Sequence, residues 1–221
     1  MNLTYFSLPS FRVDPGKIKT IDTAVPRIYQ DFCQGLQDRG EEIRVSNDDF
    51  ESLRLTKSIN WYGDPFLSIN LNQLFQRKLQ ARVEQAMTQE QIVQLSDNLR
   101  QLLGTILSDS YLMDVPLELP ESPDISKLIK FSGLQVDMTA QVTAYDILET
   151  LIKIQMELGD HRVIAVTNLS HYLNADQLNQ LVRLVATTDL SIVIIEFSFC
   201  NRREFFSKCD YSYIDSDFVI W

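Results

Sequence analysis

Long uncharged apolar runs are missing from this 221-residue sequence. No stretch approaches the roughly 18 to 20 uncharged apolar residues that a membrane-spanning helix needs, so we expect no membrane partner. The opening segment, Met1 to Ser10, has no basic region and no cleavage site of small residues, and it does not read as a secretory signal. These absences predict a cytoplasmic protein.

Cysteine, glycine and proline are also scarce. The three cysteines, Cys33, Cys200 and Cys209, are an odd number in no metal-like spacing. They are expected to be reduced thiols, as is usual in the cytoplasm. With only 7 glycines and 7 prolines, the chain is not expected to contain long disordered segments.

Positive charge is in short supply. The chain has 20 Lys and Arg against 30 Asp and Glu, which gives a net charge of -10 and a pI near 4.7. A surface of this charge repels nucleic acid as a whole. Any DNA binding must therefore come from a local basic patch, or from one that assembly of several chains creates.

Sequence motifs of enzymes are absent. The nearest candidate for a phosphate-binding loop, Gly16-Lys17, has Phe11 where the first glycine should be and Ile18 where Ser or Thr should be. The dinucleotide fingerprint G-x-G-x-x-G and the nucleophile elbow G-x-S-x-G do not occur. The chain is therefore predicted not to be an enzyme.

Three polar residues are candidates for a catalytic role. His161 and His171 stand outside any metalloprotease pattern and are interpreted as exposed side chains. Glu196 ends an apolar strand, as a Walker B acid would, but a structural role fits it equally well. The alternative that the protein is a nuclease or an NTPase rests only on the α/β pattern described next.

Apolar runs at 163–166 and 190–195, with a helix starting at Asn174 or Asp176 between them, are typical of a βαβ unit with buried parallel strands. Further strands are predicted at 2–8, 17–23, 43–45, 58–62, 134–136 and 211–220. Further helices are predicted at 26–37, 124–130 and 144–158. The fold class is therefore α/β.

The middle of the chain has a different pattern. Apolar residues recur at helical spacing over 70–87 and again over about 88–107. Thr88 with Gln91 forms a capping box, which starts a new helix at that point. The sequence thus predicts an α/β head, residues 1–66 and 124–221, and a helical leg with an acidic loop, residues 67–123.

The acidic loop carries five carboxylates within sixteen residues: Asp109, Asp114, Glu118, Glu121 and Asp124. Oxygen ligands on a proline-rich, non-helical segment suit calcium, which accepts six to eight oxygens in loose geometry. The EF-hand pattern is absent. A solvated acidic loop without a metal remains the alternative.

Basic residues do not form one run. They occur in short groups: Arg54 with Lys57, Arg77 with Lys78 and Arg82, Lys127 with Lys130, and Arg202 with Arg203. Any such group is usually solvated surface. Two or three per subunit become a DNA-binding groove only if several subunits present them to one axis.

The assembled pattern resembles the small CRISPR-associated adaptation protein of type II-A systems, the Csn-two family. The similar segments lie, in order, at 1–8, 70–107, 128–136, 163–168, 192–196 and 213–220. No single segment is a catalytic signature. Their order, spacing and total length carry the resemblance.

The resemblance implies an α/β head related in topology to P-loop ATPases but without nucleotide binding, plus a helical leg. It implies a homotetrameric ring, stabilised by calcium on acidic loop residues, that binds the ends of linear double-stranded DNA without sequence preference. Such proteins act in spacer acquisition, a part of antiviral defence, with the CRISPR integrase proteins and the effector nuclease. They are not known as enzymes.

Carried onto this sequence, the resemblance implies calcium ligands at Asp114, Glu118, Glu121 and Asp124. It likewise implies DNA-binding residues, namely Arg54, Lys57, Lys127 and Lys130.

One departure concerns the residues before the strand at 163. A lysine run known from a relative is replaced here by Gly159-Asp160-His161-Arg162. The change moves DNA contacts to other residues, or favours the alternative function of a protein–protein scaffold of the adaptation complex with little DNA binding of its own.

Overall fold

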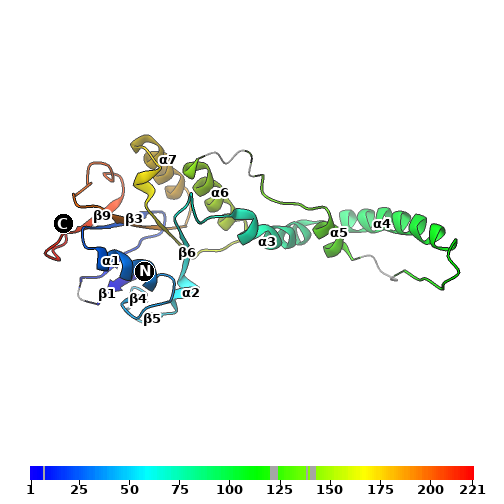
Figure 1. Cartoon of the computed structure of the whole chain (residues 1–221), viewed down its shortest axis with the longest axis horizontal. Helices are drawn as coiled ribbons and strands as arrows, with labels where there is room; N and C mark the ends of the chain where they lie inside the picture. The colour runs from blue at the N-terminus through cyan, green and yellow to red at the C-terminus, as the bar shows by residue number, and fades with distance from the viewer. Residues whose placement is uncertain (7, 120–123, 138, 140–142) are drawn as a thin grey trace. The chain divides into compact units, whose positions relative to one another are not determined.

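The computed structural model describes residues 1–6, 8–119, 124–137, 139 and 143–221. It contains two compact units, one formed by Met1–Asn70 with Asp137–Trp221 and the other by Leu71–Val136 (Figure 1). The expected boundaries were 66/67 and 123/124. The structure instead groups the helix after the acidic loop with the helical unit.

The larger unit is built on a parallel five-stranded sheet in the order β6-β7-β8-β3-β9. Its strands are β3 (Ile18–Thr23), β6 (Ile59–Gly63), β7 (Val163–Thr167), β8 (Ile192–Phe197) and β9 (Asp210–Ile214). Every residue of β3 and β7 is buried, as expected for strands covered on both faces. The parallel pairing of β7 with β8 confirms the βαβ unit.

A smaller antiparallel sheet in the order β2-β1-β4-β5 lies beside α1. Its strands are β1 (Asn2–Tyr5), β2 (Phe11–Arg12), β4 (Ile43–Ser46) and β5 (Ser52–Leu53). The helix α1 (Pro26–Gly35) begins with the expected proline, and its buried Ile28 and Phe32 join one core with β1, β4 and the large sheet. Because strand side chains alternate, Val193 and Ile195 of β8 face this core.

The other face of the large sheet is covered by α6 (Ala144–Glu157) and α7 (Ala175–Ala186) (Figure 1). Both helices begin with capping boxes, at Thr143 and at Asn174. Two short helices complete the unit, α2 (Leu55–Ser58) and the 3₁₀ turn η1 (Leu169–His171). The predicted α/β fold with a helical part is confirmed.

The helical unit contains α3 (Leu71–Ala86), α4 (Gln89–Ser110) and α5 (Ile125–Phe131). The predicted capping box at Thr88 is present and separates α3 from α4. Helix α5 belongs to this unit because it packs against α3, and the hydroxyl of Ser126 on α5 donates to the carboxylate of Glu84 on α3 at 2.7 Å. None of the described helices is long and apolar enough to cross a membrane.

The predicted strand at 134–136 is wrong. These residues are irregular, because side-chain amides of α3 bind their backbone groups in place of a neighbouring strand. Asn72 accepts from the amide of Val136 at 2.7 Å, and Gln80 donates to the carbonyl oxygen of Leu134 at 2.9 Å. The C-terminal strand is also shorter than predicted, since β9 ends at Ile214.

Candidate nucleic-acid interface

The single turn of α2 places two predicted DNA-binding residues on the surface. Arg54 is its N-cap and Lys57 its basic last-turn residue, and both side chains are exposed. Leu55 packs against the hydrophobic core from the inner side of the turn. The hydroxyl of Ser58 donates to the carbonyl oxygen of Arg54 at 3.1 Å and fixes the turn. Burial of Leu55 therefore presents the two cations to solvent.

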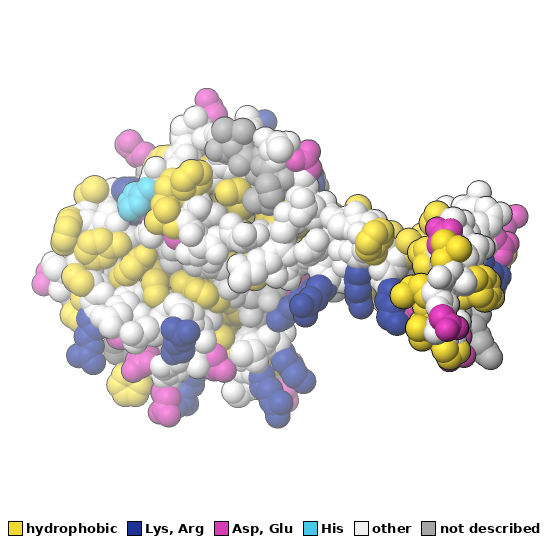
Figure 2. All heavy atoms as spheres, turned by 45° about the vertical axis from the view of Figure 1, so that its right-hand side comes forward, with side chains coloured by type: hydrophobic (Ala, Val, Ile, Leu, Met, Phe, Trp, Pro, Cys, Tyr) yellow, Lys and Arg dark blue, Asp and Glu magenta, His cyan; other side chains and the backbone are white. Residues whose placement is uncertain are grey.

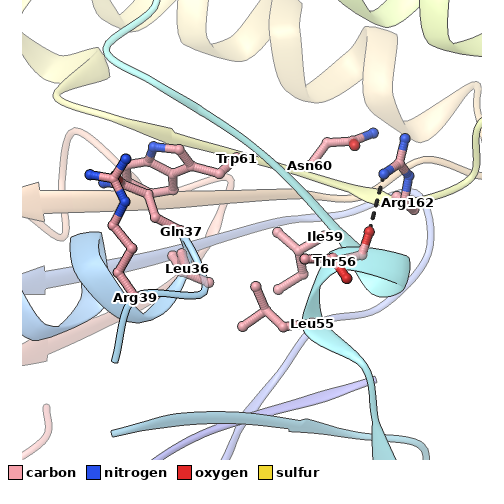
Figure 3. Close-up of a pocket in the computed structure, with 9 residues that line it drawn as sticks. All are labelled: Leu36, Gln37, Arg39, Leu55, Thr56, Ile59, Asn60, Trp61 and Arg162. Carbon is pink, nitrogen blue, oxygen red and sulfur yellow. Dashed lines mark hydrogen bonds between the residues drawn. The ribbon is translucent and has the colours of Figure 1, made fainter. Parts of the chain in front are cut away.

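A hollow of about 360 Å³ lies between α2, the end of α1 and the edge strand β6. Figure 3 shows Arg39 and Trp61 on one side of it and Arg162 with Thr56 on the other. A second hollow of about 300 Å³ shares Leu55 and Thr56 with the first. The two together make a recessed surface around α2.

Arg162 lines the first hollow, but its guanidinium is already engaged. It donates to Asp160 from Nε at 2.8 Å and also from Nη2, and to the carbonyl oxygen of Thr56 from Nη1 at 3.1 Å. The hydrogen bond from Arg162 lowers the pKa of Asp160 to about 2, so the carboxylate stays charged and offsets the arginine. The guanidinium of Arg162 is thus engaged in contacts within the larger unit.

Four other cationic side chains lie around α2 and are not paired with a described acidic residue. We define the basic surface as Arg39, Arg44, Arg54 and Lys57. No side chain of this set has a hydrogen-bond or ion-pair partner among the described residues. Arg44 and Arg54 line the second hollow, together with the carboxylate of Asp38. Figure 2 shows basic side chains standing out along the lower side of the larger unit, with acidic ones between them.

Arg39, Arg44 and Trp61 were not predicted as site residues. Arg39 stands directly before Gly40, where the helical pattern of α1 has ended, and Arg44 alternates with buried residues of β4. Neither has a sequence neighbour that indicates binding. Only the folded structure brings Arg44 to the same hollow as Arg54, and Arg39 to the same hollow as Trp61.

The other two predicted DNA-binding residues lie on α5 in the helical unit. Lys127 pairs with Asp124 at 3.4 Å. Lys130 is exposed and lines a hollow of about 200 Å³ with Arg77 of α3. Each unit therefore carries its own pair of predicted cations, and the four are not gathered in one unit.

The predicted calcium ligands divide into three cases. Asp114 and Glu118 are exposed in irregular segments, whereas Glu121 lies outside the described residues. Asp124 is the N-cap of α5 and accepts from the backbone amide of Lys127 at 3.1 Å, which is the main cause of its lowered pKa. Among the described residues, no group of three or more His, Cys, Asp or Glu side chains is placed to hold a metal ion. The donor chemistry fits calcium, and the calcium site stays a prediction.

The carboxyl end of the parallel sheet, where α/β proteins commonly bind ligands, holds a buried ionic cluster. Asp22 of β3 and Glu196 of β8 are paired in register and fully buried. Arg202 lies between them, donating to Asp22 at 3.0 Å and to Glu196 at 3.1 Å. Burial raises the pKa of Glu196, while hydrogen bonds from the amide and hydroxyl of Ser170 counteract the shift.

This cluster supports the structural interpretation of Glu196. The connection from β3 to α1 is Ala24-Val25 followed by Pro26, so no glycine-rich loop stands at the position of a nucleotide site. Arg202 fills the space between the two carboxylates where a cation would otherwise be needed. His161 and His171 are exposed, as predicted.

Comparisons with known proteins give three results. A family model described as CRISPR-associated protein (Cas_Csn2) matches residues 37–218. The crystal structure of Stu0660 of Streptococcus thermophilus is similar with a TM-score of 0.58 at 10% identity, covering 97% of this chain and 74% of that chain. A nucleotide-free ATP-binding cassette of an ABC transporter aligns with a TM-score of 0.44 at 12% identity, over 93% of this chain and 79% of that chain. No curated protein gives a significant match.

Proposed function

This chain belongs to the CRISPR-associated Cas_Csn2 family, and from that premise we propose that it binds the ends of linear double-stranded DNA during CRISPR spacer acquisition. It does so in the cytoplasm without catalysis, as a homotetrameric ring stabilised by calcium. The integrase proteins and the effector nuclease are its partners in this process.

The basic surface is the observation that carries the proposal. In a chain with a net charge of -10, four unpaired cations are grouped around α2 and its two hollows. Lys and Arg side chains that neutralise phosphates supply most of the sequence-independent affinity for DNA. Because the chain as a whole is acidic, its DNA binding depends on a local group of cations such as this one.

The exposed face of α4 supports self-association. This 22-residue helix has no buried residue, although it carries the apolar side chains expected of a packed helix. Leu102 is 62% exposed and Ile106 60% exposed, and Figure 2 shows apolar side chains gathered on the surface of the helical unit. A second copy of the chain offers the same apolar face and would cover it.

Calcium suits the acidic loop in this scheme. Asp114, Glu118 and Asp124 have exposed carboxylates that can donate oxygen ligands. Among the described residues, neither Asp114 nor Glu118 forms an ion pair, whereas Asp124 pairs with Lys127. Binding a divalent cation would lower the repulsion between these loops and DNA, and would order them.

The decisive experiment measures the mass by light scattering with calcium and with a chelator, and then compares binding of linear and closed-circular DNA on the same sample. A calcium-stabilised tetramer that prefers linear DNA is expected, because a ring can pass over an end but not over a closed circle. A strict monomer in calcium, or equal affinity for both DNA forms, would overturn the proposal.

The scaffold is the second candidate, favoured by the acidic charge and by the uncovered apolar face of α4. It predicts weak DNA binding by the isolated protein, and tight, salt-sensitive binding would remove it. The absence of catalysis is tested by incubation with magnesium, ATP and DNA, where neither ATP hydrolysis nor DNA cleavage is expected.

A further inference from the structure

We propose that the hollow between Arg39, Trp61 and α2 binds one unpaired nucleotide at the end of the DNA, with the base against the Trp61 indole and its phosphate on Arg39. This inference rests on the proposed function, because the basic surface must first bring a DNA end to the hollow. It adds a preference for ends with an overhanging base over blunt ends.

The size of the hollow suits a single nucleotide. Its volume of about 360 Å³ lies near the lower end of small-molecule pockets, which span about 300 to 1,000 Å³. The wall is mixed, with apolar side chains of Leu36, Leu55 and Ile59 at its base and polar groups around them (Figure 3). A terminal base pair holds two bases side by side and is too wide for a hollow of this size, whereas a single unpaired base can enter it.

Trp61 supplies the stacking surface. Its side chain is partly buried against the core and partly exposed to the hollow, so one part of the indole is fixed and another is accessible. It stands on β6, the edge strand of the sheet, where the register shifts between Trp61 and Gly63. Such irregularities re-aim side chains at sheet edges. Aromatic side chains held in this way bind unpaired bases without sequence preference.

The charges of the hollow select a phosphate. Arg39 has no side-chain partner among the described residues, and Figure 3 shows its guanidinium beside the indole of Trp61. Arg162, on the opposite wall, is neutralised by Asp160 and holds Thr56. The free cation therefore lies on the indole side, where the phosphate of a stacked nucleotide needs it. A neutral aromatic ligand would make no use of Arg39.

Continuity with the rest of the basic surface identifies the ligand as part of a DNA strand. The second hollow, which holds Arg44 and Arg54, adjoins the first through Leu55 and Thr56. Phosphates of the same strand that follow the unpaired nucleotide would pass over these cations. A free mononucleotide would use only Arg39.

The chain's two tryptophans give a direct test. Trp221 lies near the C-terminus and far along the sheet order from β6, so Trp221→Phe leaves Trp61 as the only indole. The full-length Trp221→Phe protein, in calcium, is titrated with a blunt duplex, with the same duplex carrying two unpaired nucleotides, with deoxyadenosine monophosphate and with inorganic phosphate.

We expect the overhanging duplex to quench Trp61 emission and to bind about fivefold or more tightly than the blunt one, the scale of one base stacked on an aromatic ring. Arg39→Gln should reduce this difference, because it removes the phosphate contact. Arg183→Gln, an exposed cation on α7, is the matched control and should leave the difference unchanged.

The outcomes separate the two proposals. Equal binding of blunt and overhanging duplexes with unchanged Trp61 emission would overturn the nucleotide site and leave DNA-end binding intact. No binding of either duplex would overturn the proposed function itself. Quenching by inorganic phosphate to the same extent as by the mononucleotide would show an anion site without a base and would also overturn the inference.

Discussion

Asp160 binds Arg162 through both carboxylate oxygens, with Nε donating to Oδ1 at 2.8 Å and Nη2 donating to Oδ2. The same arginine donates to the carbonyl oxygen of Thr56 on α2. One ion pair therefore links the entry of β7 to the turn that presents Arg54 and Lys57. Arg162 therefore has a structural role.

Asp160→Asn should destabilise the larger unit, by about 1 to 2 kcal/mol at neutral pH. The pKa of Asp160 is lowered to about 2 in the folded state, so its charge stabilises the fold above its ordinary pKa of about 4. This contribution is lost as the pH falls from about 4 to about 2. Chemical denaturation of both proteins over pH 2 to 7 measures the difference.

Asp189→Asn is the matched control, because Asp189 is exposed and has no side-chain partner among the described residues. It should change stability little at any pH. A difference between wild type and Asp160→Asn that stays constant down to pH 2 would show that the carboxylate charge is not the cause.

Arg202→Gln should destabilise the protein by about 3 kcal/mol or more, because it leaves two buried carboxylates without their cation. The pKa of Glu196 is already raised by burial, and the change should raise it further. A raised carboxyl pKa means that protonation favours the folded state. The variant should therefore regain stability as the pH falls from 7 toward 5, which thermal unfolding at several pH values would measure.

The neighbouring Arg203 is exposed and makes no side-chain ion pair among the described residues. Arg203→Gln serves as the control and should unfold like the wild type. Comparable losses in the two variants would contradict a structural role for the buried cluster.

Local patterns predicted the elements of this fold better than the contacts between them. The capping box at Thr88 and the apolar run of β7 depend on neighbours in sequence, and both are present. The strand predicted at 134–136 failed because its backbone groups bind amides of α3, more than fifty residues earlier in the chain. Nothing in the local pattern distinguishes those amides from ordinary surface residues.

In the candidate site, too, some residues could be predicted from the sequence and others only from the folded structure. Arg54 and Lys57 were predicted through the family resemblance, and the structure places them on the exposed turn α2. Arg39 and Trp61 were missed, because they reach the same hollow from separate elements. Arg162 could be assigned to an ion pair only after the structure showed the orientation of Asp160.

Leu102→Gln with Ile106→Gln should dissociate the proposed tetramer without unfolding the chain, since both side chains are exposed in the single subunit. Mass by light scattering and helical content by circular dichroism measure the two effects. Met156→Gln with Val219→Gln removes two exposed apolar side chains of the larger unit and is the control. An unchanged mass for the α4 variant would place the subunit contacts elsewhere.

Asp124→Asn should weaken calcium binding and preserve α5. Asparagine caps helix N-termini about as well as aspartate, so the acceptor for the amide of Lys127 is retained while the charge is lost. Calorimetric titration with calcium is expected to show lower affinity, and circular dichroism is expected to show the same helix content. Unaltered calcium affinity would exclude Asp124 as a ligand.

Arg54→Gln with Lys57→Gln should weaken binding of linear duplex DNA and reduce its dependence on salt. Each cation that neutralises a phosphate contributes about 0.9 to the slope of log affinity against log salt concentration. The slope should therefore become shallower by about 2, because two phosphate contacts are lost. Titrations at four or more salt concentrations measure the slope directly.

The control for this pair must remove the same charge from elsewhere in the larger unit. Arg183→Gln with Lys208→Gln does so, since both residues are exposed and neither has a side-chain partner among the described residues. A general electrostatic effect would shift affinity and slope equally in the two double variants, because each changes the net charge by the same amount. A shallower slope in the α2 variant alone assigns the phosphate contacts to the basic surface.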